Sequence, residues 1–223
     1  MADRNSTCTK IKILVVDDHP TVREALAVRV AKNPGLEICG EATDVAEAIR
    51  LSIEMHPDVI VTDITLKNGD GIDLIKRLKA RDPDARILVW SMHSEKLYAD
   101  RVLRAGALGY VTKEQPTEKI IDAIREVMAG KYFLSDQMRE RLLFRVAHGG
   151  DGENCSPVDS LSDRELEVFR LIGQGIKTQE IAERLHLSIK TVETHRDRIK
   201  KKLDLKDATD LIRSAALWVA ENA

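Results

Sequence analysis

The sequence has 223 residues, a length that favours two compact domains. Its 43% hydrophobic and 32% charged residues, with a net charge of −2, exclude a disordered or collagen-like chain. Cys8, Cys39 and Cys155 form no close pair, which excludes a disulfide framework or a Cys-x-x-Cys site and favours the reducing cytoplasm. No apolar run approaches the roughly 20 residues that cross a bilayer, so we expect neither secretion nor contact with a membrane.

Residues 11–130 alternate short β-branched runs with longer amphipathic stretches, which is typical of βα units around a parallel sheet. The expected strands are Ile11–Val16, Leu36–Gly40, Val59–Thr62, Arg86–Ser91 and Leu108–Val111. The expected helices are Pro20–Lys32, Asp44–Met55, Gly71–Arg81, Glu95–Ala105 and Pro116–Ala129. Residues 9–130 therefore predict an α/β domain, a doubly wound five-stranded parallel sheet.

The rest of the chain predicts a linker followed by a small all-α domain. A short helix over Asp136–Val146 and a Gly-, Pro- and Ser-containing segment make residues 131–160 the linker. Residues 161–223 predict four helices: Ser162–Gly173, Thr178–Leu185, Ser188–Leu203 and Ala208–Ala220. Ser162 and Glu165 have the spacing of a capping box, and Thr178 and Ser188 are expected N-caps. About three residues separate the second helix from the third, which is typical of a helix-turn-helix.

Polar residues follow four strands of the predicted sheet. They are therefore expected at its carboxyl edge, where the functional groups of parallel sheets usually lie. Asp17 and Asp18 end the first strand and Asp63 ends the third, so three carboxylates are expected to converge. An all-oxygen cluster of this kind suits Mg²⁺. Ser91 ends the fourth strand and Lys113 follows the fifth, and a hydroxyl and an ammonium beside a carboxylate suit a phosphoryl group. Single acidic residues at strand ends are common turn formers, so the complete set carries the prediction of a phosphoryl site.

The first domain resembles the receiver domain of bacterial two-component response regulators in VVDDHPTVREAL, VIVTDITLKNGDGIDLI, ILVWSMHS and AGALGYVTKE. The resemblance implies that Asp63 is the phospho-acceptor of a sensor histidine kinase. It implies that Mg²⁺ is held by Asp17, Asp18, Asp63 and the backbone carbonyl of Thr65. It also implies a switch made of Ser91, Tyr110 and Lys113, although an aromatic residue in a strand is also common as plain core packing.

Near the acidic residues, the loop after Asp63 departs from the family pattern, and His19 follows the first acidic pair. The loop after the acceptor reads Leu66-Lys67-Asn68-Gly69 where the family often has Met-Pro, so we expect a more mobile loop in which Gly71 permits the backbone turn. His19 is interpreted as a helix-start residue, because no second His or Cys stands at metal-ligand spacing.

The third helix of the second domain is basic, although residues 156–223 carry no net charge. Between Ser188 and Leu203 it has six Lys and Arg against two acidic residues, an excess that suits contact with a phosphate backbone. Its apolar positions, Ile189, Val192, Ile199 and Leu203, are expected to face the core. Because charged helix faces are commonly just solvated, charge alone does not establish DNA binding.

The segment from Leu161 to Leu203 resembles the LuxR-type helix-turn-helix of NarL/FixJ response regulators throughout its length. The resemblance implies contacts with double-stranded DNA by Lys177, Thr178, Ser188, Lys190, Thr191, Glu193, Thr194, His195, Arg198 and Lys202. It implies packing roles for Glu165, Ile181, Ala182, Leu185, Val192, Ile199 and Leu203. The last helix has Leu211, Ile212, Ala215 and Trp218 on one predicted face, which suits either the core or a dimer contact.

Together the two domains predict a cytoplasmic transcription factor without enzymatic activity. Phosphorylation of Asp63 is expected to control homodimerisation and binding to paired operator half-sites. One alternative is a small phosphohydrolase, but Thr65 stands where a D-x-D arrangement would place its second acid. Another is a phosphorylation-independent scaffold or DNA binder, which the presence of Asp63 and Lys113 disfavours.

Overall fold

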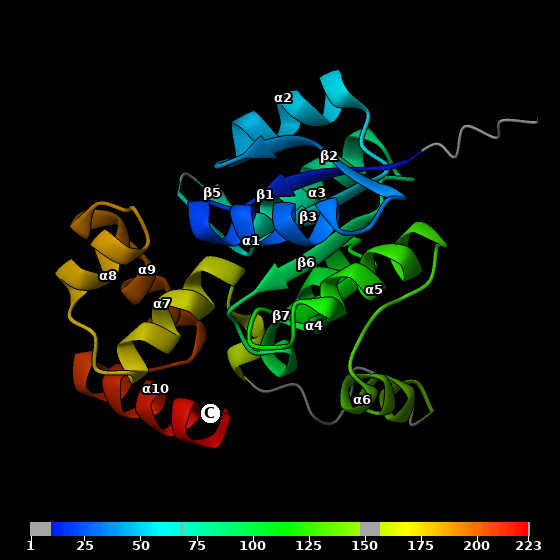
Figure 1. Cartoon of the computed structure of the whole chain (residues 1–223). Coiled ribbons are helices and arrows are strands. Elements are labelled where there is room, and N and C mark those ends of the chain that lie inside the picture. The colour runs from blue at the N-terminus through cyan, green and yellow to red at the C-terminus, as the bar shows by residue number, and fades with distance from the viewer. Residues whose placement is uncertain (1–9, 68, 148–156, 223) are drawn as a thin grey trace, which may run out of the picture. The chain divides into compact units, whose positions relative to one another are not determined.

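The computed structural model describes residues 10–67, 69–147 and 157–222. The chain divides into two compact units, the first ending at Met138 and the second beginning at Arg139 (Figure 1). Part of the predicted linker, residues 148–156, lies outside the described residues, as do Cys8 and Cys155. In the described ranges no helix is long and apolar enough to cross a membrane.

The first unit contains a parallel sheet of five strands in the order β2-β1-β3-β6-β7. Its strands are β1 (Ile11–Val16), β2 (Leu36–Ala42), β3 (Val59–Thr62), β6 (Ile87–Ser91) and β7 (Gly109–Thr112). All of β3 and β6 and the last four residues of β1 are buried, as expected for strands covered on both faces. The predicted α/β fold is therefore confirmed, and β1 and β3 are neighbours, Val16 pairing with Thr62.

Helices cover both faces of this sheet (Figure 1). They are α1 (Pro20–Ala31), α2 (Val45–Met55), α3 (Gly71–Arg81), α4 (Glu95–Ala105) and α5 (Glu118–Met128). Leu26 and Val30 of α1 and Ile120 and Ile124 of α5 belong to one core cluster with the strands. Because the helices cover the faces, the carboxyl ends of the strands are left for functional groups.

The segment after Asp63 differs from the prediction. Residues expected to form a loop form a small antiparallel hairpin, β4 (Thr65–Leu66) and β5 (Gly69–Asp70). Gly71 is needed for space, because a Cβ there would lie 2.0 Å from the carbonyl oxygen of Asp63. Elsewhere, α5 begins at Glu118 after its N-cap Thr117, so Pro116 precedes the helix and does not open it.

The second unit is helical, and α6 (Asp136–Ala147) runs across the boundary into it. A 3₁₀ turn, η1 (Pro157–Ser160), precedes α7 (Asp163–Gly173), α8 (Thr178–Arg184), α9 (Ile189–Lys202) and α10 (Ala208–Asn222). The capping box is confirmed, since Ser162 and Glu165 exchange hydrogen bonds at the start of α7. Ser188 caps α9 by accepting from the Thr191 N–H at 3.0 Å. The N-cap of α8 is Lys177, so the prediction for Thr178 was wrong by one residue.

The core of the second unit contains most of the predicted packing residues. Ile181, Val192 and Ile199 are fully buried, and the Trp218 ring lies 5.8 Å from that of Phe169. Ile189 and Ile212, both expected on apolar faces, are each 49% exposed. Ile189 is the first residue of α9, and Ile212 is turned by about 100° from its buried neighbour Leu211, given 3.6 residues per helical turn.

Candidate functional site

The carboxyl ends of β1, β3, β6 and β7 bring the predicted polar residues together. Lys113 Nζ lies 2.5 Å from Asp17 Oδ2 and 2.5 Å from Asp63 Oδ2. The Ser91 hydroxyl donates to Asp63 Oδ1 at 2.5 Å. At most 6% of the side chain of Asp17, Asp63 or Lys113 is exposed. Asp63 thus accepts from a hydroxyl at the end of β6 and from an ammonium on the residue after β7.

Burial and ion pairing oppose each other in this cluster. Burial raises the pKa of Asp17, even though the neighbouring Lys113 acts to lower it. Burial acts to lower the pKa of Lys113, but the carboxylates of Asp63 and Asp17 outweigh it and leave that pKa above its ordinary value. Lys113 is therefore a permanent cation at neutral pH. The carboxylates of Asp17, Asp18 and Asp63 outweigh its charge, which leaves a net negative site suited to a cation.

Asp18 and Thr65 complete the set of residues predicted to hold a metal. Asp18 Oδ1 is buried; His19 Nδ1 lies 2.8 Å from it, but no described atom donates to it with hydrogen-bond geometry. Thr65 lies in β4, two residues after Asp63, and its hydroxyl is 2.8 Å from His93 Nε2. Carboxylate and carbonyl oxygens with an acceptor left unsatisfied match the donor set that Mg²⁺ prefers. The residues present therefore fit a hard divalent cation.

Tyr110 lies behind the cluster and is only 1% exposed. Its hydroxyl donates to the carbonyl oxygen of His93 at 2.9 Å. Burial raises the pKa of Tyr110 well above its ordinary value, so the phenol keeps its proton and its role as a donor.

The sequence analysis did not select His93, which connects the β4–β5 hairpin after Asp63 to the predicted switch residue Tyr110. The His93 ring forms a hydrogen bond with the Thr65 hydroxyl and lies 4.9 Å from the Tyr98 ring. The backbone carbonyl of His93 accepts from the Tyr110 hydroxyl. Its position two residues after Ser91, at the same sheet edge, is the signal that could have identified it.

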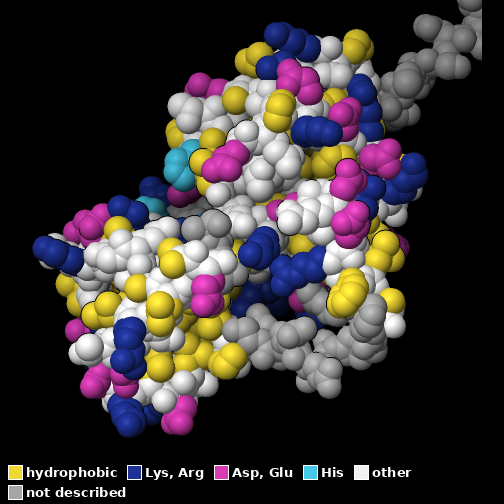
Figure 2. Space-filling view, turned by 90° about the horizontal axis from the view of Figure 1, so that it is seen from below, with side chains coloured by type: hydrophobic (Ala, Val, Ile, Leu, Met, Phe, Trp, Pro, Cys, Tyr) yellow, Lys and Arg dark blue, Asp and Glu magenta, His cyan; other side chains and the backbone are white. Residues whose placement is uncertain are grey.

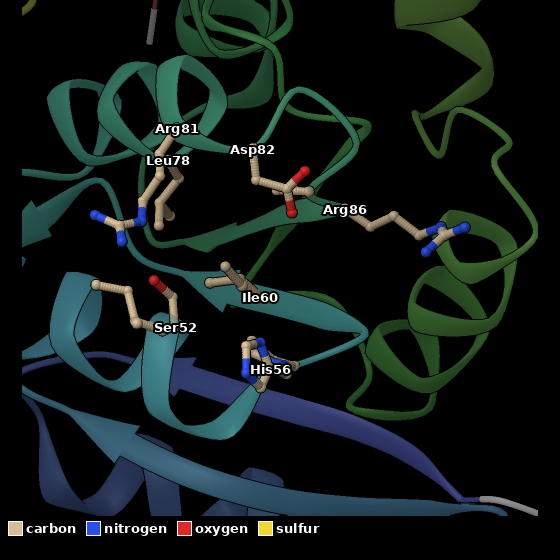
Figure 3. Close-up of a pocket in the computed structure, with 10 residues that line it drawn as sticks. Ser52, His56, Ile60, Leu78, Arg81, Asp82 and Arg86 are labelled. Atoms are coloured by element: carbon tan, nitrogen blue, oxygen red, sulfur yellow. The ribbon is translucent and has the colours of Figure 1, made fainter.

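Asp63, Ser91 and Lys113 line a pocket of about 510 Å³, together with residues that include Thr21, Trp90 and Met92. A second pocket of about 300 Å³ lies at the opposite edge of the sheet (Figure 3). There Ser52 of α2 and His56, which follows that helix, face Arg81 and Asp82 across Ile60. None of the predicted site residues lines that second pocket.

The residues predicted to bind DNA lie around α9 and the turn before it. Lys177, Ser188, Lys190, Glu193, Thr194 and Arg198 are exposed, and Thr178 and Thr191 are half-buried. In the part of the chain that the structure describes, Lys177, Lys190 and Arg198 form no ion pair. These three cations are therefore available to phosphate groups.

Lys202 and His195 differ from the other predicted DNA contacts. Lys202 Nζ binds Glu165 Oε2 at 2.6 Å and the Ser160 carbonyl oxygen at 3.1 Å. Despite the burial of Glu165, hydrogen bonds from Lys202 and Ser162 hold its pKa below the ordinary value. His195 Nδ1 is buried without a hydrogen bond from described atoms, and burial, with Arg164 nearby, lowers the His195 pKa. Lys202 is thus paired with Glu165 inside the second unit, and His195 is partly buried in it.

Hydrophobic side chains gather on the visible face of the second unit (Figure 2). On α10, Ile212 and Leu217 are 49% and 61% exposed, whereas Leu211 and Ala215 are fully buried. The predicted apolar face of the last helix therefore divides into a core side and an exposed side. Exposed apolar groups on a small helical domain suit a protein contact.

Comparison with known proteins matches each unit to a family. Residues 13–125 match the response regulator receiver domain, and residues 159–215 match the bacterial regulatory proteins of the luxR family. The transcriptional regulatory protein LiaR of Bacillus subtilis (strain 168) is 39% identical over 214 residues, which cover 95% of this chain and 98% of LiaR.

Solved structures of similar architecture cover nearly the whole chain. RcsB of Salmonella enterica serovar Typhimurium, bound to promoter rprA in the presence of phosphomimetic BeF3-, is 26% identical with a TM-score of 0.61. That comparison covers 93% of this chain and 99% of RcsB. A structure of two RcsB dimers bound to two parallel DNAs is 26% identical with a TM-score of 0.57, covering 92% of this chain and 97% of that one.

Proposed function

The chain belongs to the NarL/FixJ family of DNA-binding response regulators, in which a receiver domain is joined to a LuxR-type helix-turn-helix, and we propose that phosphorylation of Asp63 by a sensor histidine kinase controls its binding to operator DNA. The observation that carries this proposal is the position of Asp63. Its two carboxylate oxygens accept separately from Ser91 and Lys113. A phosphoryl group there would present three further acceptor oxygens to the same two donors.

Asp17, Asp18, Asp63 and the Thr65 carbonyl would hold Mg²⁺ in this proposal. When bound, the ion supplies positive charge for the phosphoryl oxygens. Lys113 pairs with the acceptor in the unmodified protein and would follow the added charge. Ser91 already donates to Asp63, and its movement toward a phosphoryl oxygen would shift the loop that includes His93, whose carbonyl binds Tyr110. That loop and Tyr110 form the bistable element on which the signal would act.

The output is binding of α9 to double-stranded DNA at paired operator half-sites. Lys190, Thr191, Glu193 and Thr194 would face the major groove, with Lys177, Thr178, Ser188 and Arg198 beside the phosphates. The RcsB structures described above contain promoter DNA and dimers, which supports a homodimer on DNA here. Ile212 and Leu217, about 140° apart around α10, flank an exposed side of that helix that would be available for pairing.

We infer a regulator that acts in the cytoplasm and is not an enzyme. The two matches are to a receiver domain and to bacterial regulatory proteins, and the DNA of a bacterium lies in its cytoplasm. A phosphohydrolase with a D-x-D arrangement would have its second acid two residues after the acceptor, but that position holds Thr65, whose hydroxyl is 2.8 Å from His93. A hydrolase of this type would therefore lack the general acid that it uses.

Intact-mass measurement after treatment with acetyl phosphate and Mg²⁺ tests the assignment of the acceptor. The wild type is expected to gain one phosphoryl group, and Asp63→Asn none. Asp84→Asn changes an exposed aspartate of the same unit and is expected to label like the wild type. Equal labelling of the wild type and Asp63→Asn would defeat the assignment.

A further inference from the structure

The turn between β1 and α1 places His19 at the edge of the acidic cluster. Its Nδ1 lies 2.8 Å from Asp18 Oδ1 and 3.3 Å from Asp17 Oδ1. Its backbone N–H donates to Asp17 Oδ1 at 2.9 Å, which fixes the turn. His19 is the N-cap of α1, but its side chain makes no capping hydrogen bond. The ring is therefore positioned by its hydrogen bond to Asp17 and its contact with Asp18, and not by capping of α1.

The spacing of these atoms matches ligands of one ion. Adjacent ligand atoms around an octahedral ion, each about 2.1 Å from it, lie about 3.0 Å apart. The distances from His19 Nδ1 to the two carboxylate oxygens lie on either side of that value. The donor atoms of Asp17, Asp18 and His19 all lie within 4.8 Å of one another. Asp18 Oδ1 is buried, and its 2.8 Å contact with His19 Nδ1 lacks hydrogen-bond geometry, so a lone pair is left for an ion.

The third donor is chemically different from the oxygens of the proposed Mg²⁺ set. Imidazole nitrogen is a good ligand for Co²⁺, Ni²⁺ and Zn²⁺, whereas Mg²⁺ prefers oxygen. The His19 side chain is 63% exposed, so small movements of the ring toward an ion would not disturb the core.

We propose that His19 is an additional ligand of the divalent cation held by Asp17 and Asp18, and that it gives this receiver a preference for nitrogen-binding transition metals over Mg²⁺. The inference rests on the proposed function, because the two aspartates must hold the ion. A simple contact between a protonated His19 and the carboxylates is the competing explanation. It predicts that metal binding displaces the ring, whereas ligation predicts a metal–nitrogen bond.

Pulsed electron paramagnetic resonance of the full-length protein with bound Mn²⁺ distinguishes these explanations, because a coordinated imidazole produces a ¹⁴N modulation. We expect this modulation in the wild type and its loss in His19→Asn. His56→Asn is the matched control, since His56 is an exposed histidine at the opposite edge of the sheet. Calorimetric titration with Co²⁺ is expected to show affinity falling by at least about tenfold in His19→Asn, since even changes beyond the ligands cost 10–100-fold. The Mg²⁺ affinity should change far less.

The outcomes separate the inference from the proposed function. Mn²⁺ that binds without a ¹⁴N modulation, and is lost in Asp18→Asn, would overturn the role of His19 and leave the aspartate site intact. Equal loss of Co²⁺ and Mg²⁺ affinity in His19→Asn would also overturn it, since a disturbed turn would affect both ions. Failure of wild type to bind any of the three ions would overturn the metal site itself.

Discussion

Lys113 Nζ lies 2.5 Å from a carboxylate oxygen of Asp63, fifty residues away in the chain, and each side chain is at most 6% exposed. The same ammonium also contacts Asp17 at 2.5 Å. One buried cation therefore compensates two carboxylates that would otherwise repel each other. This makes Lys113 a structural requirement of the unmodified receiver as well as a partner for a phosphoryl group.

We predict that Lys113→Met destabilises the receiver by about 3 kcal/mol, because removing one member of a buried ion pair leaves uncompensated charge. Combining it with Asp63→Asn should restore part of the loss, since one of the two carboxylates is then neutral. A double-mutant cycle by urea denaturation measures the coupling. Simple additivity of the two changes would contradict the pairing.

Alkaline pH provides an independent test of the same contact. The folded pKa of Lys113 is raised above its ordinary value of 10.5, so its contribution is complete below that pH and is lost as the pH rises through the folded pKa. We expect unfolding free energy to fall above about pH 10.5 in the wild type. The fall should be smaller in Lys113→Met, and an identical alkaline profile for both proteins would argue against the raised pKa.

The sequence predicted the strands and the Asp63 cluster well because buried runs and strand ends are local signals. β1 and β3 were predicted with the observed bounds, and a parallel sheet necessarily brings Asp17 and Asp63 to one edge. The positions of His19 and His93 could not be predicted in this way. The position of the His19 ring depends on the path of the turn that brings it back to Asp17 and Asp18, and that of His93 on contacts with Thr65 and Tyr110 from other parts of the chain.

Lys202 illustrates a second limit of sequence reasoning. By residue type and spacing along the helix, Lys202 matches a phosphate contact just as Arg198 does. Only the folded domain shows that Lys202 Nζ lies 2.6 Å from Glu165 Oε2. Similarly, the apolar spacing of Ile189 and Ile212 does not reveal that each side chain points outward. A residue at a helix start or one position off the buried stripe can satisfy the sequence pattern without reaching the core.

We predict that Lys202→Ala and Lys190→Ala act on different properties. Lys202→Ala should lower the stability of the second unit by about 1 kcal/mol, a value discounted for solvent screening because 40% of that side chain is exposed. Lys190→Ala should leave stability unchanged and reduce the log–log salt slope of DNA binding by about 1. Thermal unfolding and salt-dependent gel shifts measure the two effects. A reduced salt slope in Lys202→Ala would instead show that Lys202 contacts a phosphate group of the DNA.

We predict that His195 makes the second unit less stable below neutral pH. Its folded pKa is lowered from the ordinary 6.5, mainly by burial, so the unfolded chain takes up a proton before the folded domain does. Stability should therefore fall as the pH drops from about 6.5 toward the folded pKa. Arg164, Glu165 and Arg198 also face this group, and the two arginines oppose its protonation.

His195→Gln is expected to flatten this pH dependence, whereas His186→Asn, at an exposed left-handed position, should retain it. Urea denaturation between pH 5 and 8 provides the comparison, within the range where histidine titrates. A wild-type profile that is unchanged by His195→Gln would show that other groups control acid stability.

Phosphorylation at Asp63 is expected to shift a monomer–dimer equilibrium and, with it, the affinity for paired half-sites. A coupling free energy of 2–3 kcal/mol, which is within the usual range, corresponds to a change of about 30- to 150-fold in the association constant. Sedimentation of the wild type with and without acetyl phosphate measures this change. Asp63→Asn should remain at the unmodified value.

The exposed side of α10 allows the assembly to be separated from the receiver chemistry. Leu217→Ser removes an apolar side chain that is 61% exposed, so it should weaken pairing without unfolding the domain. Phosphorylation of Asp63 in this variant should be normal by intact mass, while binding to paired half-sites weakens and binding to a single half-site is retained, because α9 is unchanged. Thr209→Ala, at an exposed position of the same helix, is the control and should pair like the wild type. If Leu217→Ser pairs normally, α10 does not provide the dimer contact. If phosphorylation of the wild type changes neither the mass of the assembly in sedimentation nor the operator affinity, control by assembly is wrong, and Asp63 must act through a different partner.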